Sequence, residues 1–290
     1  MYLGEIMDMQ KIQWFPGHMT KAMRMMEENV KLVDGIIFVL DARAPFACIN
    51  KTLEKKLGNR PFLYVLNKSD LISESDRDFI VKKLVNDGKK VVCAIGTQSG
   101  GCKNIYPAFC SLLTEKIQRI EAKGLSRTLR AMVAGVPNTG KSTIINALCG
   151  KKAAQVGNKA GVTRGKQWVK LDGFEMLDTP GTMPPSLDNN EYGLHLAFIG
   201  GLNDAILDEG DLCLAFIERM LTLAPDALVQ KYGITVENKT PLEVYEDICV
   251  KRGYLLKGGE KDYSRCALAV IDDFRKGRLG KVCLEGKTAL

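Results

Sequence analysis

Residues 130–143 read RAMVAGVPNTGKST, a short apolar run followed by a glycine-rich turn. Residues 135–142 match the pattern GxxxxGK[ST], in which a loop between a strand and a helix surrounds phosphate groups with backbone N–H groups. The N-terminus of the following helix adds a favourable dipole. Lys141 is expected to bind the β- and γ-phosphates and to act in catalysis, and the Ser142 hydroxyl to bind Mg²⁺. The predicted nucleotide contacts of this loop are Asn138, Thr139, Gly140, Lys141, Ser142 and Thr143.

Short apolar runs alternate with longer amphipathic stretches on both sides of this loop, which predicts an α/β fold with a mostly parallel sheet. After Gly181 the pattern changes, because Pro184 and Pro185 interrupt it and the remaining segments read as helical. We therefore expect a nucleotide-binding domain over 1–185 and a smaller helical domain over 186–290. The predicted strands cover 36–40, 61–66, 90–95, 130–134, 168–171 and 174–177. The predicted helices cover 20–32, 49–57, 74–86, 104–123, 141–148, 191–199, 211–223, 241–251 and 263–276.

Composition narrows the class of protein. The 290 residues are 46% hydrophobic and 26% charged, as in ordinary globular proteins, and no run is long enough to predict a membrane span. The net charge of +7 is uneven, with 28 basic and 17 acidic residues in 1–183 but 13 and 17 in 184–290. A basic half is compatible with a polyanion such as RNA or with a solvated lysine-rich surface. Nine scattered cysteines without a CxxC pair, and no secretory leader, predict reduced thiols in the cytoplasm.

A second motif, Asn67-Lys68-Ser69-Asp70, follows the apolar run 61–66 and matches the guanine-specificity pattern NKxD. The Asp70 carboxylate can accept hydrogen bonds from N1–H and the 2-amino group of guanine, whereas adenine offers neither donor there. Asn67 is expected to contact the base edge, and the Lys68 stem to pack along the base. Together with the phosphate loop, this motif predicts GTP rather than ATP as the ligand.

A third motif, Asp178-Thr179-Pro180-Gly181, follows the apolar run 174–177. An Asp at this point of a phosphate-loop protein binds Mg²⁺, and the N–H of the Gly contacts the γ-phosphate. Between the phosphate loop and this motif, Gly161-Val162-Thr163 supplies a threonine suited to Mg²⁺ and the γ-phosphate. The predicted metal ligands are therefore Ser142, Thr163 and Asp178.

The order of the three motifs is unusual, because NKSD precedes the phosphate loop and DTPG comes last. The same sheet still forms if the natural chain ends are joined and the chain opens elsewhere, a circular permutation. One consequence is mechanical. The segments that contact the γ-phosphate lead directly into the helical segment. Binding of GTP can therefore rearrange the surface that the helical segment offers to a partner.

The permuted order and several short motifs resemble the RbgA/YlqF family of ribosome-biogenesis GTPases. These motifs are WFPGHM (14–19), DAR (41–43), NKSD, GVPNTGKST, GVT (161–163) and QWVK (167–170), with KYG, KRG and GG near the C-terminus. The resemblance covers nearly the whole chain. It implies GTP hydrolysis coupled to late assembly of the large ribosomal subunit and contact with its rRNA.

The resemblance also bears on individual residues. GTPases often orient the attacking water with a glutamine after the DxxG glycine, but Thr182 and Met183 stand there, and Thr182 departs from the hydrophobic residue usual in the family. The family points instead to the histidine of WFPGHM, here His18, whose alternatives are packing on Trp14 or binding phosphate. His195 is expected to be structural. In similar GTPases an asparagine at the position of Asn138 helps bind K⁺, and the alternative is a bond to its own backbone.

Other assignments stay open at this point. Arg43 and Arg164 are explained equally well by contacts with phosphate or RNA and by surface salt bridges. Two alternative functions remain. The protein could hold GTP with little turnover, or it could be a phosphate-loop kinase of a small molecule. A monomer is the default expectation.

Overall fold

The computed structural model describes residues 17–58, 60–150, 167–171, 173–184, 190–202 and 207–289. A six-stranded sheet with the order β3-β2-β1-β4-β6-β5 forms its centre, and only β5 runs antiparallel to its neighbour. The α/β fold with a mostly parallel sheet is thereby confirmed. The strands are β1 (Gly35–Asp41), β2 (Phe62–Asn67), β3 (Lys90–Cys93), β4 (Leu129–Ala134), β5 (Gln167–Leu171) and β6 (Phe174–Asp178).

Helices cover both faces of the sheet, because side chains alternate between its two faces along each strand. Ile36, Phe38 and Leu40 of β1 point to the face that α2, α3 and α4 cover, whereas Ile37 and Val39 point to the face of α5 and α7. These helices are α2 (Gly17–Asn29), α3 (Lys51–Lys56), α4 (Glu74–Asn86), α5 (Ile105–Leu112), α6 (Thr114–Glu121) and α7 (Lys141–Cys149).

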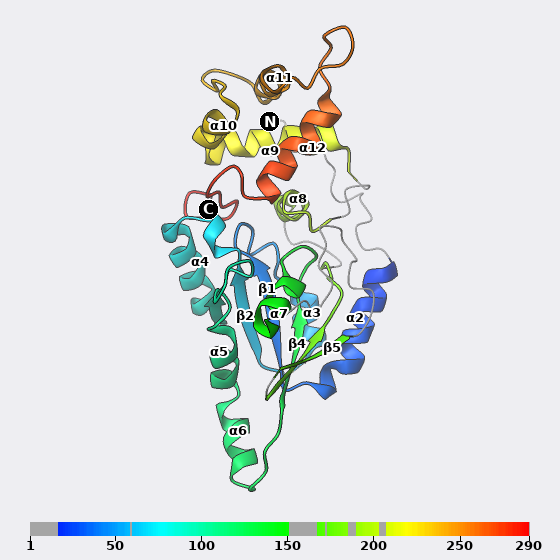
Figure 1. Ribbon diagram of the computed structural model, residues 1–290, viewed down its shortest axis with the longest axis vertical. Helices are drawn as coiled ribbons and strands as arrows, with labels where there is room; N and C mark the ends of the chain where they lie inside the picture. Colours follow the sequence, from blue (N-terminus) through cyan, green and yellow to red (C-terminus); the bar gives the residue numbers. More distant parts are fainter. Residues whose placement is uncertain are drawn as a thin grey trace.

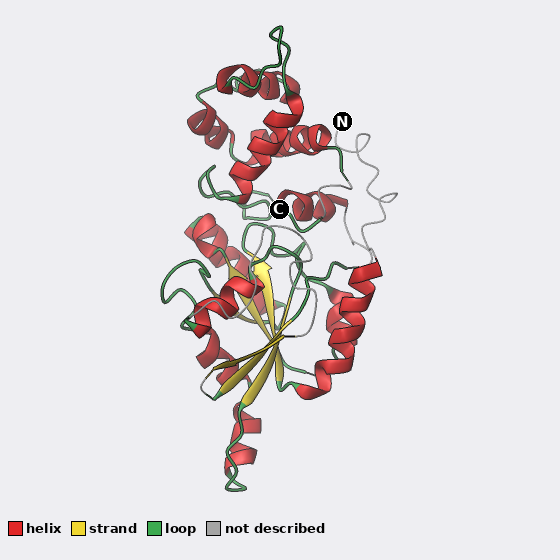
Figure 2. Ribbon diagram, turned by 45° about the vertical axis from the view of Figure 1, so that its right-hand side comes forward, coloured by secondary structure: helices red, strands yellow, loops and turns green. Residues whose placement is uncertain are grey.

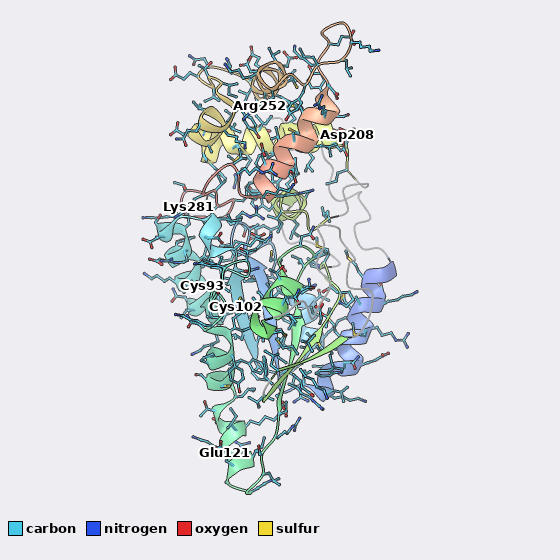
Figure 3. All side chains as sticks on the ribbon, in the orientation of Figure 1. Cys93, Cys102, Glu121, Asp208, Arg252 and Lys281 are labelled. Carbon is cyan, nitrogen blue, oxygen red and sulfur yellow. The ribbon has the colours of Figure 1, made fainter. Side chains whose placement is uncertain are left out.

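The helical part of the chain stands above the edge where the parallel strands end, and α6 forms the opposite end of the molecule (Figure 1). In Figure 3 Glu121 and Arg252 mark these two ends. The helices here are α8 (Asn190–Phe198), α9 (Glu209–Leu223), α10 (Pro225–Tyr232), α11 (Pro241–Arg252) and α12 (Tyr263–Arg275). Figure 2 shows them as a layer of their own beyond the strands.

The helical part and the sheet nevertheless share one apolar core. Phe198, Phe216 and Phe274 of the helices belong to the same buried cluster as Phe38 and Leu40 of β1. The tail 277–289 then returns between the helices and the sheet (Figure 1), where the Leu284 N–H donates to the Arg43 carbonyl at 2.8 Å. The predicted division at 185/186 stays a prediction.

Two helices differ from the sequence prediction. The helix predicted over 104–123 is interrupted at Leu113, where the Thr114 hydroxyl bonds to the Ser111 carbonyl at 2.9 Å and competes with the helical pattern. Helix α10 was not predicted. It begins at Pro225, a residue favoured in the first helical turn, and ends at Gly233 in the left-handed conformation.

Within the described residues, no helix combines the length and the apolar character needed to cross a lipid bilayer.

Candidate functional site: a guanine-nucleotide site at the ends of four parallel strands

Three predicted motifs meet at one edge of the sheet. NKSD follows β2, the phosphate loop follows β4 and DTPG follows β6, and β1 lies between β2 and β4. Because all four strands are parallel, their carboxyl ends point to the same edge, the usual position of ligand sites in such sheets. The structure therefore brings together motifs that lie far apart in the permuted sequence, NKSD at 67–70 and DTPG at 178–181.

The phosphate loop holds its lysine within its own backbone. Lys141 is buried, and its ammonium donates to the carbonyls of Gly135 at 3.2 Å and Val136 at 2.8 Å. Burial lowers the pKa of Lys141 to about 8, although the Asp178 charge acts in the opposite direction. A phosphate group would supply the negative charge that best keeps this ammonium protonated.

Ser142 and Asp178 form the candidate Mg²⁺ site. The Ser142 hydroxyl lies 3.1 Å from a carboxylate oxygen of Asp178, and Asp178 is fully buried at the end of β6. Hydroxyl and carboxylate oxygens are the ligands that Mg²⁺ prefers, and it usually takes one or two of them beside phosphates and waters. No cluster of three His, Cys, Asp or Glu side chains occurs in the described part of the chain. Thr163, the third predicted ligand, lies outside the described residues.

The NKSD segment bonds to the phosphate loop rather than only facing a base. The Asn67 amide donates to the Thr139 carbonyl at 2.8 Å and accepts from the Gly96 N–H at 3.0 Å. Lys68 adopts a left-handed conformation, and its ammonium donates to the Asn138 carbonyl at 2.8 Å. Asp70 is exposed, so its carboxylate is accessible to a ligand.

DTPG packs directly against the phosphate loop. A Cβ on Gly181 would lie 2.6 Å from the Pro137 backbone nitrogen, so this close approach requires glycine. The Thr182 N–H donates to the Gly135 carbonyl at 3.2 Å, and the Thr182 and Met183 side chains are fully buried. Neither residue is placed to replace the water-orienting glutamine.

Asn138 reaches the helical part of the chain. Its side-chain amide donates to the Gly200 carbonyl at 2.5 Å, just beyond α8. This long-range bond differs from the local backbone bond that was the sequence-based alternative to K⁺ binding.

Arg43 forms a salt bridge, one of the sequence-based explanations, but inside the protein and not at the surface. It is buried and forms an ion pair with Asp41, Nη2 lying 2.8 Å from Oδ2. The same carboxylate oxygen accepts from the Lys68 ammonium at 2.8 Å. Burial would raise the pKa of Asp41, but the charges of Arg43 and Lys68 outweigh it and hold that pKa below its ordinary value. The position of DAR directly after an apolar strand was the signal for this cluster.

The two histidines differ in what the structure shows. His195 is buried, with Nδ1 2.9 Å from a Glu285 oxygen, which fits the structural role expected of it. The predicted catalytic His18 lies in the first turn of α2, but its side chain lies outside the described residues, as does Arg164.

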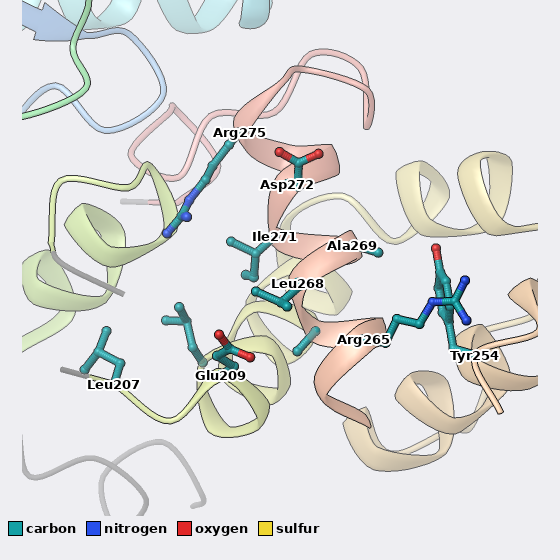
Figure 4. A pocket seen from close by; sticks show the side chains of 11 residues that line it. Leu207, Glu209, Tyr254, Arg265, Leu268, Ala269, Ile271, Asp272 and Arg275 are labelled. Carbon is teal, nitrogen blue, oxygen red and sulfur yellow. The ribbon is translucent and has the colours of Figure 1, made fainter. Parts of the chain in front are cut away.

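A separate hollow of about 590 Å³ lies between α9, α12 and the segment at Tyr254. Figure 4 shows Arg265 over the Tyr254 ring, its guanidinium carbon 5.2 Å from the ring centroid. None of its lining residues belongs to the three nucleotide motifs.

Comparisons with known proteins show the family to which the chain belongs. A family model described as 50S ribosome-binding GTPase matches residues 130–246. Ribosome biogenesis GTPase A of Bacillus cereus is 36% identical over 94% of this chain and 93% of its own. Mitochondrial ribosome-associated GTPase 1 of Bos taurus is 31% identical over 94% of this chain and 88% of its own.

The crystal structure of GNP-bound YlqF from T. maritima superposes with a TM-score of 0.64 at 27% identity, covering 92% of this chain and 98% of that one. The GDP-bound structure of the same protein gives a TM-score of 0.61 over 90% and 98%. The chain is thus a member of the RbgA/YlqF family of ribosome biogenesis GTPases.

Proposed function

We propose that this protein binds GTP with Mg²⁺ and hydrolyses it to GDP and phosphate during late maturation of the large ribosomal subunit. The observation that carries the proposal is the meeting of NKSD, the phosphate loop and DTPG at one sheet edge. GTPase family membership and the GNP- and GDP-bound relatives support it.

Each group has a role that its position supports. Asp70 selects guanine, and Lys141 neutralises charge on the β- and γ-phosphates as the bond to the leaving oxygen breaks. Ser142, Asp178 and Thr163 would hold Mg²⁺, which would supply further charge neutralisation when bound. We assign to His18 the orientation of the attacking water, because Thr182 and Met183 are buried and lack the usual amide.

The helical part, 186–290, is the proposed contact with the ribosomal particle and its rRNA. The bond from Asn138 to Gly200 joins it to the phosphate loop. A change of nucleotide therefore has a direct route to the surface that this part presents. All nine cysteines are free, which accords with the predicted cytoplasmic location.

A protein that holds GTP with little turnover is the second candidate, favoured by the absence of a glutamine after Gly181. GTP would then serve to order the loops, and release of phosphate would not govern departure from the ribosome.

Turnover measurements separate these functions. We would measure GTP hydrolysis in K⁺ buffer with and without isolated large ribosomal subunits, in the wild type, in His18→Ala and in Thr20→Ala. Thr20 is exposed on the same helix and serves as the matched control. We expect strong stimulation by the subunit in the wild type and in Thr20→Ala, and its loss in His18→Ala. Slow turnover that no ribosomal particle accelerates would favour the holding function instead.

A further inference from the structure

Asp41 connects the NKSD lysine to an arginine that is otherwise remote from the nucleotide motifs. Its Oδ1 accepts from the Arg43 backbone N–H at 3.1 Å and from the Arg43 side chain at 3.0 Å. Its Oδ2 accepts from Arg43 and from Lys68, each at 2.8 Å. Because Asp41 is fully buried, this carboxylate has no water to replace a lost partner. The position of either cation therefore depends on the other.

The far side of the Arg43 guanidinium contacts the last turn of α12. Nη1 donates to the Phe274 carbonyl at 2.7 Å and to the Arg275 carbonyl at 3.2 Å. The guanidinium carbon also lies 4.7 Å from the centroid of the Phe274 ring. Carbonyls in the last turn of a helix lie at its negative end, so a buried cation is favourable there. The Phe274 carbonyl also accepts from the Gly277 N–H at 2.9 Å, and Arg43 adds a charged donor to it.

Arginine suits both contacts at once. Its planar fork of donors binds a carboxylate with two nitrogens and still presents a third to carbonyls on another side, which the single ammonium of lysine does not do in one geometry. If α12 moves away, Nη1 loses its acceptors inside a buried environment. The guanidinium then has to shift to find others, and Asp41 and Lys68 shift with it.

We propose that Arg43 is a positioning residue that makes guanine-nucleotide binding at Lys68 depend on the docking of α12 and the tail 277–289. The proposal rests on the GTP site proposed above. Lys68 donates to the Asn138 carbonyl of the phosphate loop as well as to Asp41, so its position affects both the base side and the phosphate side of the site. By thermodynamic reciprocity, a nucleotide that favours this position of Lys68 must equally favour the docked α12.

A purely structural role for Arg43 makes a different prediction. An arginine that only stabilises the core lowers the free energy of unfolding when it is replaced, but leaves no link between nucleotide occupancy and the tail. The test must therefore measure the protection of the tail 277–289 directly, with and without bound nucleotide.

Hydrogen exchange of residues 277–285 provides this readout, measured with and without saturating GDP in the full-length protein. We expect GDP to slow exchange there in the wild type, and to have no such effect in Arg43→Lys, which keeps the charge but not the fork. Arg43→Lys is also expected to raise the GDP dissociation constant about tenfold, the effect of one weakened charged hydrogen bond.

Arg219→Lys is the matched control. Arg219 donates to the Leu284 carbonyl at 3.1 Å in the same tail, but it pairs with Glu191 and not with Asp41 or Lys68. This variant should keep the GDP-dependent protection. If Arg43→Lys does not fold, Lys68→Met provides a second test, because it removes the ion pair between Lys68 and Asp41 at the partly exposed Lys68. Loss of GDP-dependent protection is expected in this variant too.

The outcomes are separable. A wild type that does not bind GDP would contradict the proposed function itself. A wild type that binds GDP without slower exchange in the tail would overturn the role of Arg43 alone. Protection retained in Arg43→Lys, or in Lys68→Met, would do the same.

Discussion

Asn67 and Thr139 lie 72 positions apart, yet the Asn67 side-chain amide donates to the Thr139 carbonyl at 2.8 Å. The other end of the amide accepts from the Gly96 N–H at 3.0 Å, so both of its polar atoms are used and the orientation of the group is fixed. Next to Thr139, Gly140 has a φ of 93° and no room for a side chain, because a Cβ there would lie 2.4 Å from Asn67 Nδ2. The NKSD segment and the phosphate loop therefore form one unit despite the permuted order.

This contact predicts that Gly140→Ala damages nucleotide binding beyond its cost in backbone strain. The new methyl group must displace Asn67 and break its bond to Thr139. We expect GDP affinity to fall about tenfold or more, in addition to roughly 1–3 kcal/mol of lost stability from the positive φ. Fluorescence titration with labelled GDP and thermal denaturation measure the two effects separately.

Gly150→Ala is the control for this prediction. Gly150 ends α7 with a φ of 66°, but a Cβ there meets nothing within 4 Å. It should lose stability from strain and keep its GDP affinity. Equal loss of affinity in both variants would show that the contact with Asn67 is unimportant.

Asp70→Asn is expected to change base specificity. An amide in place of the exposed carboxylate presents a donor, which fits the 2-oxo group of xanthine better than the 2-amino group of guanine. We expect GDP affinity to fall about 100-fold and affinity for xanthosine diphosphate to rise, since unmatched polar groups are penalised strongly. Asp78→Asn, an exposed carboxylate on α4 with the same change of charge, should keep the guanine preference. Unaltered specificity in Asp70→Asn would mean that another group reads the base.

The sequence predicted the strands well, because several apolar runs of the parallel sheet end at a recognisable motif. Asn67 closes β2 and Asp178 closes β6, so strand and motif mark each other. A capping residue likewise marks the start of a helix. The side chain of Ser73 accepts from the Asp76 N–H, and α4 begins at Glu74, where the helix was predicted to begin.

What sequence reasoning missed depends on contacts between distant positions. Arg43 bonds to the Phe274 carbonyl across 231 positions. Every residue has a backbone carbonyl, so the sequence does not indicate which one accepts this bond. The partner of Asn138 is likewise a carbonyl, that of Gly200. Local patterns reveal which segments form helices and strands, but they do not reveal which carbonyl a buried cation will meet.

The Asp41 cluster predicts a specific dependence of stability on acidity. The pKa of Asp41 is lower in the folded protein than its ordinary value of 3.8, so its stabilising contribution is fully present above pH 3.8 and is lost as the pH falls below it. Asp41→Asn should lose about 3–5 kcal/mol at pH 7, because Arg43 and Lys68 lose a buried partner. Between pH 5 and pH 3 the difference from the wild type should shrink by about 1 kcal/mol. Urea denaturation of both proteins at several pH values gives this difference, and one that stays constant down to pH 3 would contradict the assignment.

The Asn138 side chain bonds to Gly200 in the structure and is also expected to bind K⁺. These two contacts use different atoms of its amide. K⁺ coordinates oxygen, whereas the bond to Gly200 uses the side-chain nitrogen. Asn138→Gly removes both contacts but tolerates the φ of 61° without strain. We expect it to lose about 1 kcal/mol of stability and to hydrolyse GTP equally fast in K⁺ and Na⁺, while the wild type is faster in K⁺. Asn238→Gly, at an exposed position with a φ of 53°, makes the same substitution in the helical part and should keep the K⁺ preference. Because the two contacts are read separately, by denaturation and by the ratio of rates, a variant that loses stability yet keeps the K⁺ preference would assign Asn138 to the helical contact alone.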